Sequence, residues 1–268
     1  MNKKSKLLEK TTSYLKTHKV AKTILSIIVV TSWVGLVYYL AQLVLANLII
    51  WIFHPTSNSS ALQSIYSVLC YLVSIAIIIL VPWRLSKQKK LNLEELGIIE
   101  LPTWGDIALA PIGFIVYLIF GAIITNIFSA FPWFNANETQ NLGYNTGVLG
   151  ADRYLILTVL VVVAPIAEEI IFRGFLYGKL RAKLVTEKGQ SKKSKRKNLL
   201  GIIIATIITS VVFGIMHGQW NVGVNVFALS IVLCALREIT GTIYAGILLH
   251  MLKNAVAFYF IFIAGLGF

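Results

Sequence analysis

The sequence predicts an all-α fold, a polytopic transmembrane helix bundle of about seven membrane helices with additional interfacial segments. Its 268 residues are 57% hydrophobic and only 13% charged, whereas a soluble domain carries about 25% charged residues. Several apolar stretches reach or approach the roughly 20 residues that cross the hydrocarbon layer. Because backbone polar groups must find their partners within the segment in lipid, a bundle of helices is the spanning architecture that such stretches form.

The net charge of +13 is distributed in a way that indicates membrane topology. Of the 24 lysine and arginine residues, seven precede Thr23, four lie in 84–90, nine lie in 179–197, and Arg237 adds one more. These clusters fall on alternate loops, which is the positive-inside pattern. We therefore expect the N-terminus and each basic cluster in the cytoplasm, against anionic lipid head groups, and the C-terminus outside. No nucleic-acid motif accompanies the charge, and nucleic acid is not expected as a partner.

Residues 1–104 are expected to form a first unit, with a basic N-terminal segment, two membrane helices and an interfacial element. The basic segment, residues 1–22, carries scattered leucines and is expected to lie on the inner membrane surface. The first apolar run is far longer than the 7–15 apolar residues of a cleavable signal peptide, so we interpret it as an uncleaved membrane helix. The elements predicted here are helices over 24–53 and 61–81, an exit from the first at His54-Pro55, a stop of the second at Pro82, and a short element over 91–104.

Residues 105–268 are expected to form a second unit, the catalytic helix bundle. A lysine-rich run over 188–197 is predicted to be a solvated cytoplasmic loop. Gly218 and the charged pair Arg237-Glu238 are predicted to end the helices that precede them. The helices predicted in this unit span about 105–130, 154–184, 199–217, 222–236 and 241–263.

Two adjacent carboxylates and an arginine interrupt the apolar run that begins near Tyr154. On a helix, Glu169 and Arg173 are four residues apart and share a face, while Glu168 is turned by about 100°. Glu168 is therefore free to point elsewhere when Glu169 pairs with Arg173. Ionisable groups at membrane depth cost at least about 2.5–3.5 kcal/mol each on insertion scales, which indicates a functional site. A structural ion pair that locks two helices is the alternative.

Two further pairs of residues at helical spacing lie later in the chain: Phe213 with His217, and His250 with Asn254. A buried carboxylate can act as a general base, and histidine can share that role, bind a metal or donate a hydrogen bond to an oxyanion. A water held between Glu168 and His217 can be activated for attack on an amide. His250 and Asn254, facing that water as hydrogen-bond donors, complete a set sufficient for amide hydrolysis. The sequence lacks the Gly-x-Ser-x-Gly and His-Glu-x-x-His motifs of serine hydrolases and zincins.

These residues resemble the membrane-embedded CAAX protease and bacteriocin-processing family (CPBP, also called Abi). The three motifs of that family are Glu-Glu-x-x-x-Arg, Phe-x-x-x-His and His-x-x-x-Asn, in that order on successive membrane helices. They appear here over 168–173, 213–217 and 250–254. The resemblance covers roughly residues 105–262, and the first two membrane helices carry no signature of it.

The resemblance implies an intramembrane endopeptidase, which in bacteria processes peptides or provides self-immunity to bacteriocins. In that family the reaction is described both as metalloprotease chemistry and as metal-free, glutamate-driven hydrolysis. The cofactor therefore stays open, and Zn²⁺ held by Glu168, His217 and His250 is one alternative. The catalytic residues implied are Glu168 as the general base, Glu169 as its partner, Arg173 as the group that orients the pair, His217 as a group that helps to activate the water, and His250 with Asn254 as contacts of the water or the oxyanion.

Other functions and the setting also follow from the residues. The main alternative is a non-catalytic bacteriocin immunity protein or membrane scaffold, in which the polar cluster is structural. A proton-coupled transporter would show inverted repeats, which the sequence lacks. Short loops, few cysteines and a composition rich in lysine and isoleucine favour a bacterial plasma (cytoplasmic) membrane. The expected partners are the lipid bilayer and a peptide or protein substrate that is membrane-associated or secreted.

Two positions fit this scheme less easily. Lys253 lies at membrane depth, where it must snorkel, pair with a carboxylate or face a wet cavity. At 1.5 Å per residue, the predicted helix ends put Glu168 and His217 roughly 20 Å apart in depth. For the two to meet, the helix before His217 must begin below the membrane boundary or tilt strongly, or the segment after His217 must not reach the outside.

Overall fold

The computed structural model describes residues 3–53, 59–86, 92–138, 140, 142–186 and 192–265. Within these ranges the regular elements are all helices, either α-helical or, in the short segments labelled η, π-helical. The elements are α1 (Lys3–Phe53), α2 (Ser60–Ile75), η1 (Ala76–Leu80), α3 (Val81–Leu85), α4 (Trp104–Phe128), α5 (Ala151–Leu157), η2 (Thr158–Val163), α6 (Ala164–Glu168), η3 (Glu169–Tyr177), α7 (Gly178–Leu184), α8 (Lys192–Ile215), α9 (Trp220–Thr240), α10 (Tyr244–Phe258) and η4 (Tyr259–Ile263).

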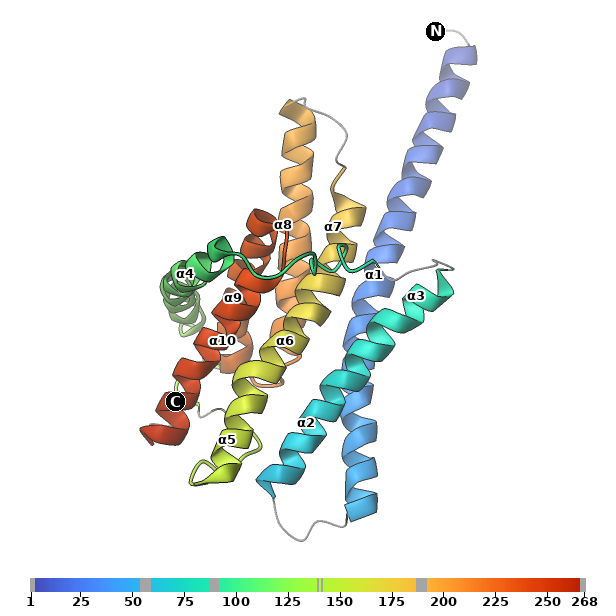
Figure 1. Cartoon of the computed structure of the whole chain (residues 1–268). Helices are drawn as coiled ribbons and strands as arrows, with labels where there is room; N and C mark the ends of the chain where they lie inside the picture. The colour runs from blue at the N-terminus through green and yellow to red at the C-terminus, as the bar shows by residue number, and fades with distance from the viewer. Residues whose placement is uncertain are drawn as a thin grey trace.

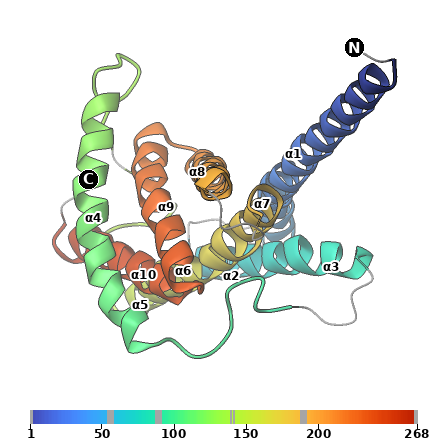
Figure 2. The same cartoon turned by 90° about the horizontal axis from the view of Figure 1, so that it is seen from above.

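Where these segments are continuous, they join into seven helices of the described chain that are long and apolar enough to cross a membrane. This result confirms the predicted all-α polytopic bundle. In both views α1 and α4 lie on opposite flanks of the molecule, and α6 with α7 runs between them (Figures 1 and 2). The seven spans are Val20–Phe53, Ser60–Leu85, Trp104–Phe128, Ala151–Leu184, Ser194–Ile215, Trp220–Thr240 and Tyr244–Ile263.

Two basic segments are helical where the sequence predicts a surface segment or a loop. α1 begins at Lys3 and not near Ile24, so the basic N-terminal segment continues directly into the first membrane helix. α8 begins at Lys192, which corrects the solvated loop predicted over 188–197; the part of that loop before Lys192 lies outside the described residues. Lysine and leucine are good helix formers, so these stretches extend the helices that their apolar neighbours form.

Proline does not end the second span, although the sequence predicts a stop there. The span continues through Pro82 to Leu85. The π-helical turn η1 ends at Leu80, two residues before this proline, and such a turn eases the clash and the lost N–H donor that proline imposes on a regular α-helix. Pro165 follows η2 in the same way. The exit predicted at His54-Pro55 lies outside the described residues.

α9 runs past the Arg237-Glu238 pair at which the sequence predicts its end, and finishes at Thr240. Gly241 terminates it in the left-handed conformation, with φ of 73°, as glycine commonly does at helix C-termini. The two charges are accommodated within the last helical turns. Arg237 donates to the carbonyl of Gly241, and Glu238 accepts a 2.7 Å hydrogen bond from the Tyr177 hydroxyl.

Residues 92–103, directly before α4, run across the bundle in Figure 1 and are anchored against the connection between α9 and α10. The amide of Ile243 donates to the carbonyl of Gly97 across 3.1 Å, and Gly97 itself has a φ of 75°. Asp106, in the first turn of α4, accepts a 3.2 Å hydrogen bond from Thr242. These contacts connect the chain that leaves the first two spans to the helices that follow.

α8 and α9 approach each other through two facing glycines. A Cβ atom built on Gly214 would lie 2.8 Å from the carbonyl oxygen of Gly223, and one built on Gly223 would lie 2.9 Å from that of Gly214. Small residues allow this close backbone contact between membrane helices. The contact fixes the end of α8, directly before His217.

We expect Gly214→Ala to destabilise the fold by about 1–3 kcal/mol, because the added methyl group forces two packed backbones apart. Gly35→Ala in α1 is the matched control, since a Cβ there meets nothing within 4 Å. We expect that change to be neutral or to stabilise by about 0.5–1 kcal/mol. Thermal unfolding of the purified variants in detergent measures both effects, and equal melting temperatures would contradict the close contact.

Candidate active site

The ion pair predicted from the four-residue spacing lies at the centre of the bundle. Arg173 Nη1 is 2.9 Å from Glu169 Oε1, and both side chains are fully buried. The guanidinium carbon of Arg173 also lies 4.3 Å from the centre of the Phe213 ring, a cation–π geometry. Glu169 and Arg173 both lie in η3, where helical spacing brings them together, while Phe213 comes from α8.

His250 connects the two glutamates from α10. Its Nδ1 is 3.1 Å from Glu169 Oε1, and its Nε2 is 3.7 Å from Glu168 Oε2. The imidazole is 3% exposed. Gly246, one turn earlier, permits this approach, because a Cβ there would lie 3.0 Å from Glu169 Oε2. The Glu-Glu-x-x-x-Arg motif and the last histidine motif therefore form one buried cluster.

Glu168 points away from the Arg173 pair, as the helical geometry predicts, and is 7% exposed. Its Oε1 accepts a 2.7 Å hydrogen bond from the hydroxyl of Tyr71 on α2. Sequence reasoning did not single out Tyr71, because the first two membrane helices match none of the three motifs. The signal available was a tyrosine within an apolar helix, since a buried tyrosine hydroxyl usually has a hydrogen-bond partner.

His217 lies in the turn after α8, beside the same cluster. Its Nδ1 is 2.8 Å from the carbonyl oxygen of Phe213. A carbonyl only accepts, so Nδ1 carries the hydrogen and Nε2 of the neutral ring is left as an acceptor. Burial lowers the pKa of His217, with a smaller opposing effect from Glu168. The imidazole is therefore assigned as neutral at neutral pH.

The aromatic ring of Phe213 packs between the two histidines. It lies edge-on to His217, with ring centres 4.8 Å apart, and edge-on to His250 at 6.0 Å. α8, which leads to His217, begins at Lys192, seven residues before the predicted start at 199. Those residues add about 10 Å at 1.5 Å each.

The remaining two polar groups of α10 have different surroundings. Asn254 donates from Nδ2 to the backbone carbonyl of Leu160 in η2 at 2.8 Å, so it ties α10 to the span that carries the glutamates. Lys253 is half-buried, and Glu168 is the acidic group that acts on it electrostatically. Among the described residues, no carboxylate oxygen lies within ion-pair distance of its ammonium group.

The side chains that the sequence leaves open as zinc ligands are Glu168, His217 and His250. Over the described part of the chain, no three His, Cys, Asp or Glu side chains converge in an arrangement that can hold a metal ion. Nδ1 of each histidine has a hydrogen-bond partner, the backbone for His217 and Glu169 for His250, so Nε2 is the nitrogen that each ring could offer to a metal. As arranged, these side chains do not fit a zinc site.

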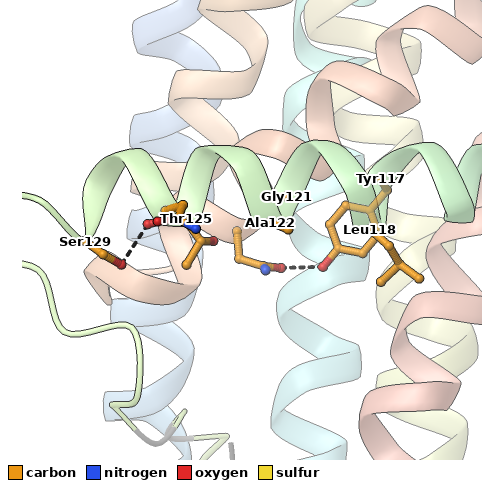
Figure 3. Close-up of a pocket in the computed structure, with 8 residues that line it drawn as sticks. Tyr117, Leu118, Gly121, Ala122, Thr125 and Ser129 are labelled. Atoms are coloured by element: carbon orange, nitrogen blue, oxygen red, sulfur yellow. Dashed lines mark hydrogen bonds between the residues drawn. The ribbon is translucent and has the colours of Figure 1, made fainter.

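A second polar feature lies between α4 and α9, in a cavity of about 340 Å³. The hydroxyl of Tyr117 donates a 2.5 Å hydrogen bond to Asn225 Oδ1, and Figure 3 shows Tyr117 with Thr125 and Ser129, which also line the cavity. None of the three motifs contributes a lining residue. The cavity is therefore separate from the glutamate and histidine cluster.

Comparison with known proteins gives two matches. Residues 150–256 match the family model described as type II CAAX prenyl endopeptidase Rce1-like. The chain is also 21% identical over 187 residues to the membrane-embedded CAAX protease MroQ of Staphylococcus aureus, which covers 69% of this chain and 68% of the relative. No solved structure matches the chain.

Both matches name CAAX proteases. The family model spans the three motifs over 168–173, 213–217 and 250–254, whose glutamates and His250 form one buried cluster with His217 beside it. Over the part that holds the three motifs, the chain is therefore similar to CAAX-type proteases.

Proposed function

We propose that this chain is an intramembrane endopeptidase that uses Glu168 as the general base to hydrolyse a peptide bond. The observation that carries this proposal is the convergence of groups from three separate parts of the chain. The Glu169–Arg173 pair, Glu168 and His250 are all buried, and His217 lies beside them. A purely structural ion pair would need only two of these groups, and buried pairs stabilise poorly.

The charged groups around the two glutamates support different roles for Glu168 and Glu169. Glu169 is paired with Arg173 and contacts His250, so it holds other groups in place. Glu168 keeps one oxygen, Oε2, facing Nε2 of His250 across 3.7 Å. Protonated His250 gives the cluster two positive and two negative charges, which lowers the cost of burying it. That state leaves His250 with a proton to give and Glu168 with a carboxylate to accept one.

In the proposed reaction, Glu168 accepts a proton from water and His250 donates a proton to the leaving group. Glu168 takes a proton from a water, whose oxygen attacks the carbonyl carbon of the scissile bond. The carbonyl electrons move to oxygen, and the tetrahedral intermediate carries an oxyanion. When the carbon–nitrogen bond breaks, the leaving nitrogen takes the Nε2 proton of His250. The proton on Glu168 then passes to His250, which restores both side chains, and the acid product ionises.

His217 and Asn254 have supporting roles in this proposal. Nε2 of neutral His217 is an acceptor, which suits it to orient the attacking water toward Glu168. Asn254 uses one N–H on Leu160, and its amide nitrogen has a second N–H that can reach the water or the oxyanion.

We further propose a bacterial plasma membrane location with a cytoplasmic N-terminus, supported by the alternate basic clusters. The proposed substrate is a membrane-associated or secreted peptide or protein, in bacteriocin or peptide processing or in self-immunity. The lipid bilayer is the other proposed partner, and nucleic acid is not.

The first test compares peptide termini in cells that carry the wild-type chain with those in cells that carry Glu168→Gln, at matched protein levels. Gln cannot take a proton, so we expect cleavage to fall by at least about 100-fold. New termini with the wild type alone support proteolysis and give the substrate. Identical termini, together with a phenotype that needs the protein but not Glu168, would support the immunity or scaffold function instead.

A second test concerns the close contact between α10 and Glu169. Gly246→Ala places a Cβ 3.0 Å from Glu169 Oε2, so the carboxylate must shift and His250 with it. We expect kcat to fall by about 10- to 100-fold, because small displacements of reacting groups are costly. Gly121→Ala is the control, since a Cβ there makes only an ordinary 3.5 Å contact with Tyr117. Equal activity of the two variants would count against the proposed geometry.

A further inference from the structure

We propose that Tyr71 is a positioning residue of the active site, acting through Glu168. This inference rests on the proposed function and deepens it, because it assigns a role to a helix outside the residues 150–256 that match the family model. The hydroxyl of Tyr71 donates to Glu168 Oε1 across 2.7 Å. Hydrogen bonds from a neutral donor to a carboxylate are short and strong, and they are stronger still in apolar surroundings.

Because of the hydrogen bond from Tyr71, the two carboxylate oxygens of Glu168 have different partners. Oε1 is held by Tyr71, while Oε2 faces His250 at 3.7 Å. A carboxylate bound at one oxygen cannot rotate freely, so Oε2 is kept toward the place where a water must lie. Glu169 has its own partners in Arg173 and His250, and Tyr71 supplies the corresponding partner for Glu168.

The tyrosine is itself held by aromatic packing. Its ring centre lies 6.3 Å from that of Tyr38 on α1, and Tyr38 lies edge-on to Phe172 of η3 at 6.0 Å. Phe172 in turn packs edge-on against Phe213 at 4.9 Å. A continuous row of rings therefore joins α1 and α2 to the two helices that carry the glutamates and His217. Replacing Tyr71 with Phe keeps its ring in this row and removes only the hydroxyl.

The chain offers a matched control on the same helix. Tyr66 also lies on α2, and its hydroxyl donates to the backbone carbonyl of Gln42 on α1 at 3.1 Å. Tyr66→Phe removes a tyrosine hydrogen bond that is also partly buried, without touching Glu168. Tyr71→Phe therefore removes the hydrogen-bond donor to Glu168, whereas Tyr66→Phe removes the donor to the Gln42 carbonyl.

The kinetic experiment uses a peptide that spans the cleavage site found by comparing termini. We expect Tyr71→Phe to lower kcat by about 10- to 100-fold, the rate equivalent of one lost hydrogen bond to a charged group. KM should stay close to that of the wild type, and Tyr66→Phe should keep wild-type kinetics. Unchanged kcat in Tyr71→Phe overturns the inference, and so does an equal loss in both variants, which would report α1–α2 packing.

A second measurement does not depend on proteolysis. The change in melting temperature caused by Tyr71→Phe is compared in the wild type and in Glu168→Leu, which lacks the acceptor. We expect Tyr71→Phe to lower the melting temperature only where Glu168 is present. The same change in both backgrounds overturns the hydrogen bond itself. A wild-type chain that cleaves nothing while this coupling persists would count against the proposed function and leave the positioning of Glu168 supported.

Discussion

The arrangement of the bundle depends on the burial of Glu169 and Arg173 in a single hydrogen-bonded ion pair. Neither side chain has any exposed surface, and a charge left alone in such surroundings would be far more costly than the pair. Groups from two other helices pack around the pair, although Glu169 Oε2 and Arg173 Nε and Nη2 have no hydrogen-bond partner among the described residues. His250 reaches Glu169 from α10, and the Phe213 ring covers the guanidinium from α8. Three helices are held at fixed positions by the need to satisfy two charges.

Close packing around this pair is achieved by small residues and by π-helical turns. Gly246 lets α10 approach Glu169, and Gly214 with Gly223 lets α8 and α9 touch through their backbones. The π-helical segment η3 begins at Glu169 itself, and such turns are frequent at functional sites. The same span holds a second π-helical segment, η2, over Thr158–Val163, so its helix geometry is irregular both before the glutamates and from Glu169 onward.

The first two spans contribute to the same centre although they lack the family motifs. α2 supplies the hydrogen bond to Glu168, and α1 supplies Tyr38, which packs between Tyr71 and Phe172. The boundary between the two predicted units, 1–104 and 105–268, is thus crossed by a polar contact. The CAAX protease family model matches residues 150–256, and the first two spans pack against this part of the chain.

The sequence alone determined the fold class, the number of spans and the Glu169–Arg173 pair, because apolar length and helical spacing are local properties. The ends of α1, α8 and α9 depended on contacts that local patterns do not contain, such as the glycine cap at Gly241 and the partners of Glu238. Only the tertiary structure decided that Tyr71 meets Glu168, since 97 residues separate them. Contacts between helices far apart in sequence are fixed by packing and by the satisfaction of buried charge, and neither has a signature in a single helix.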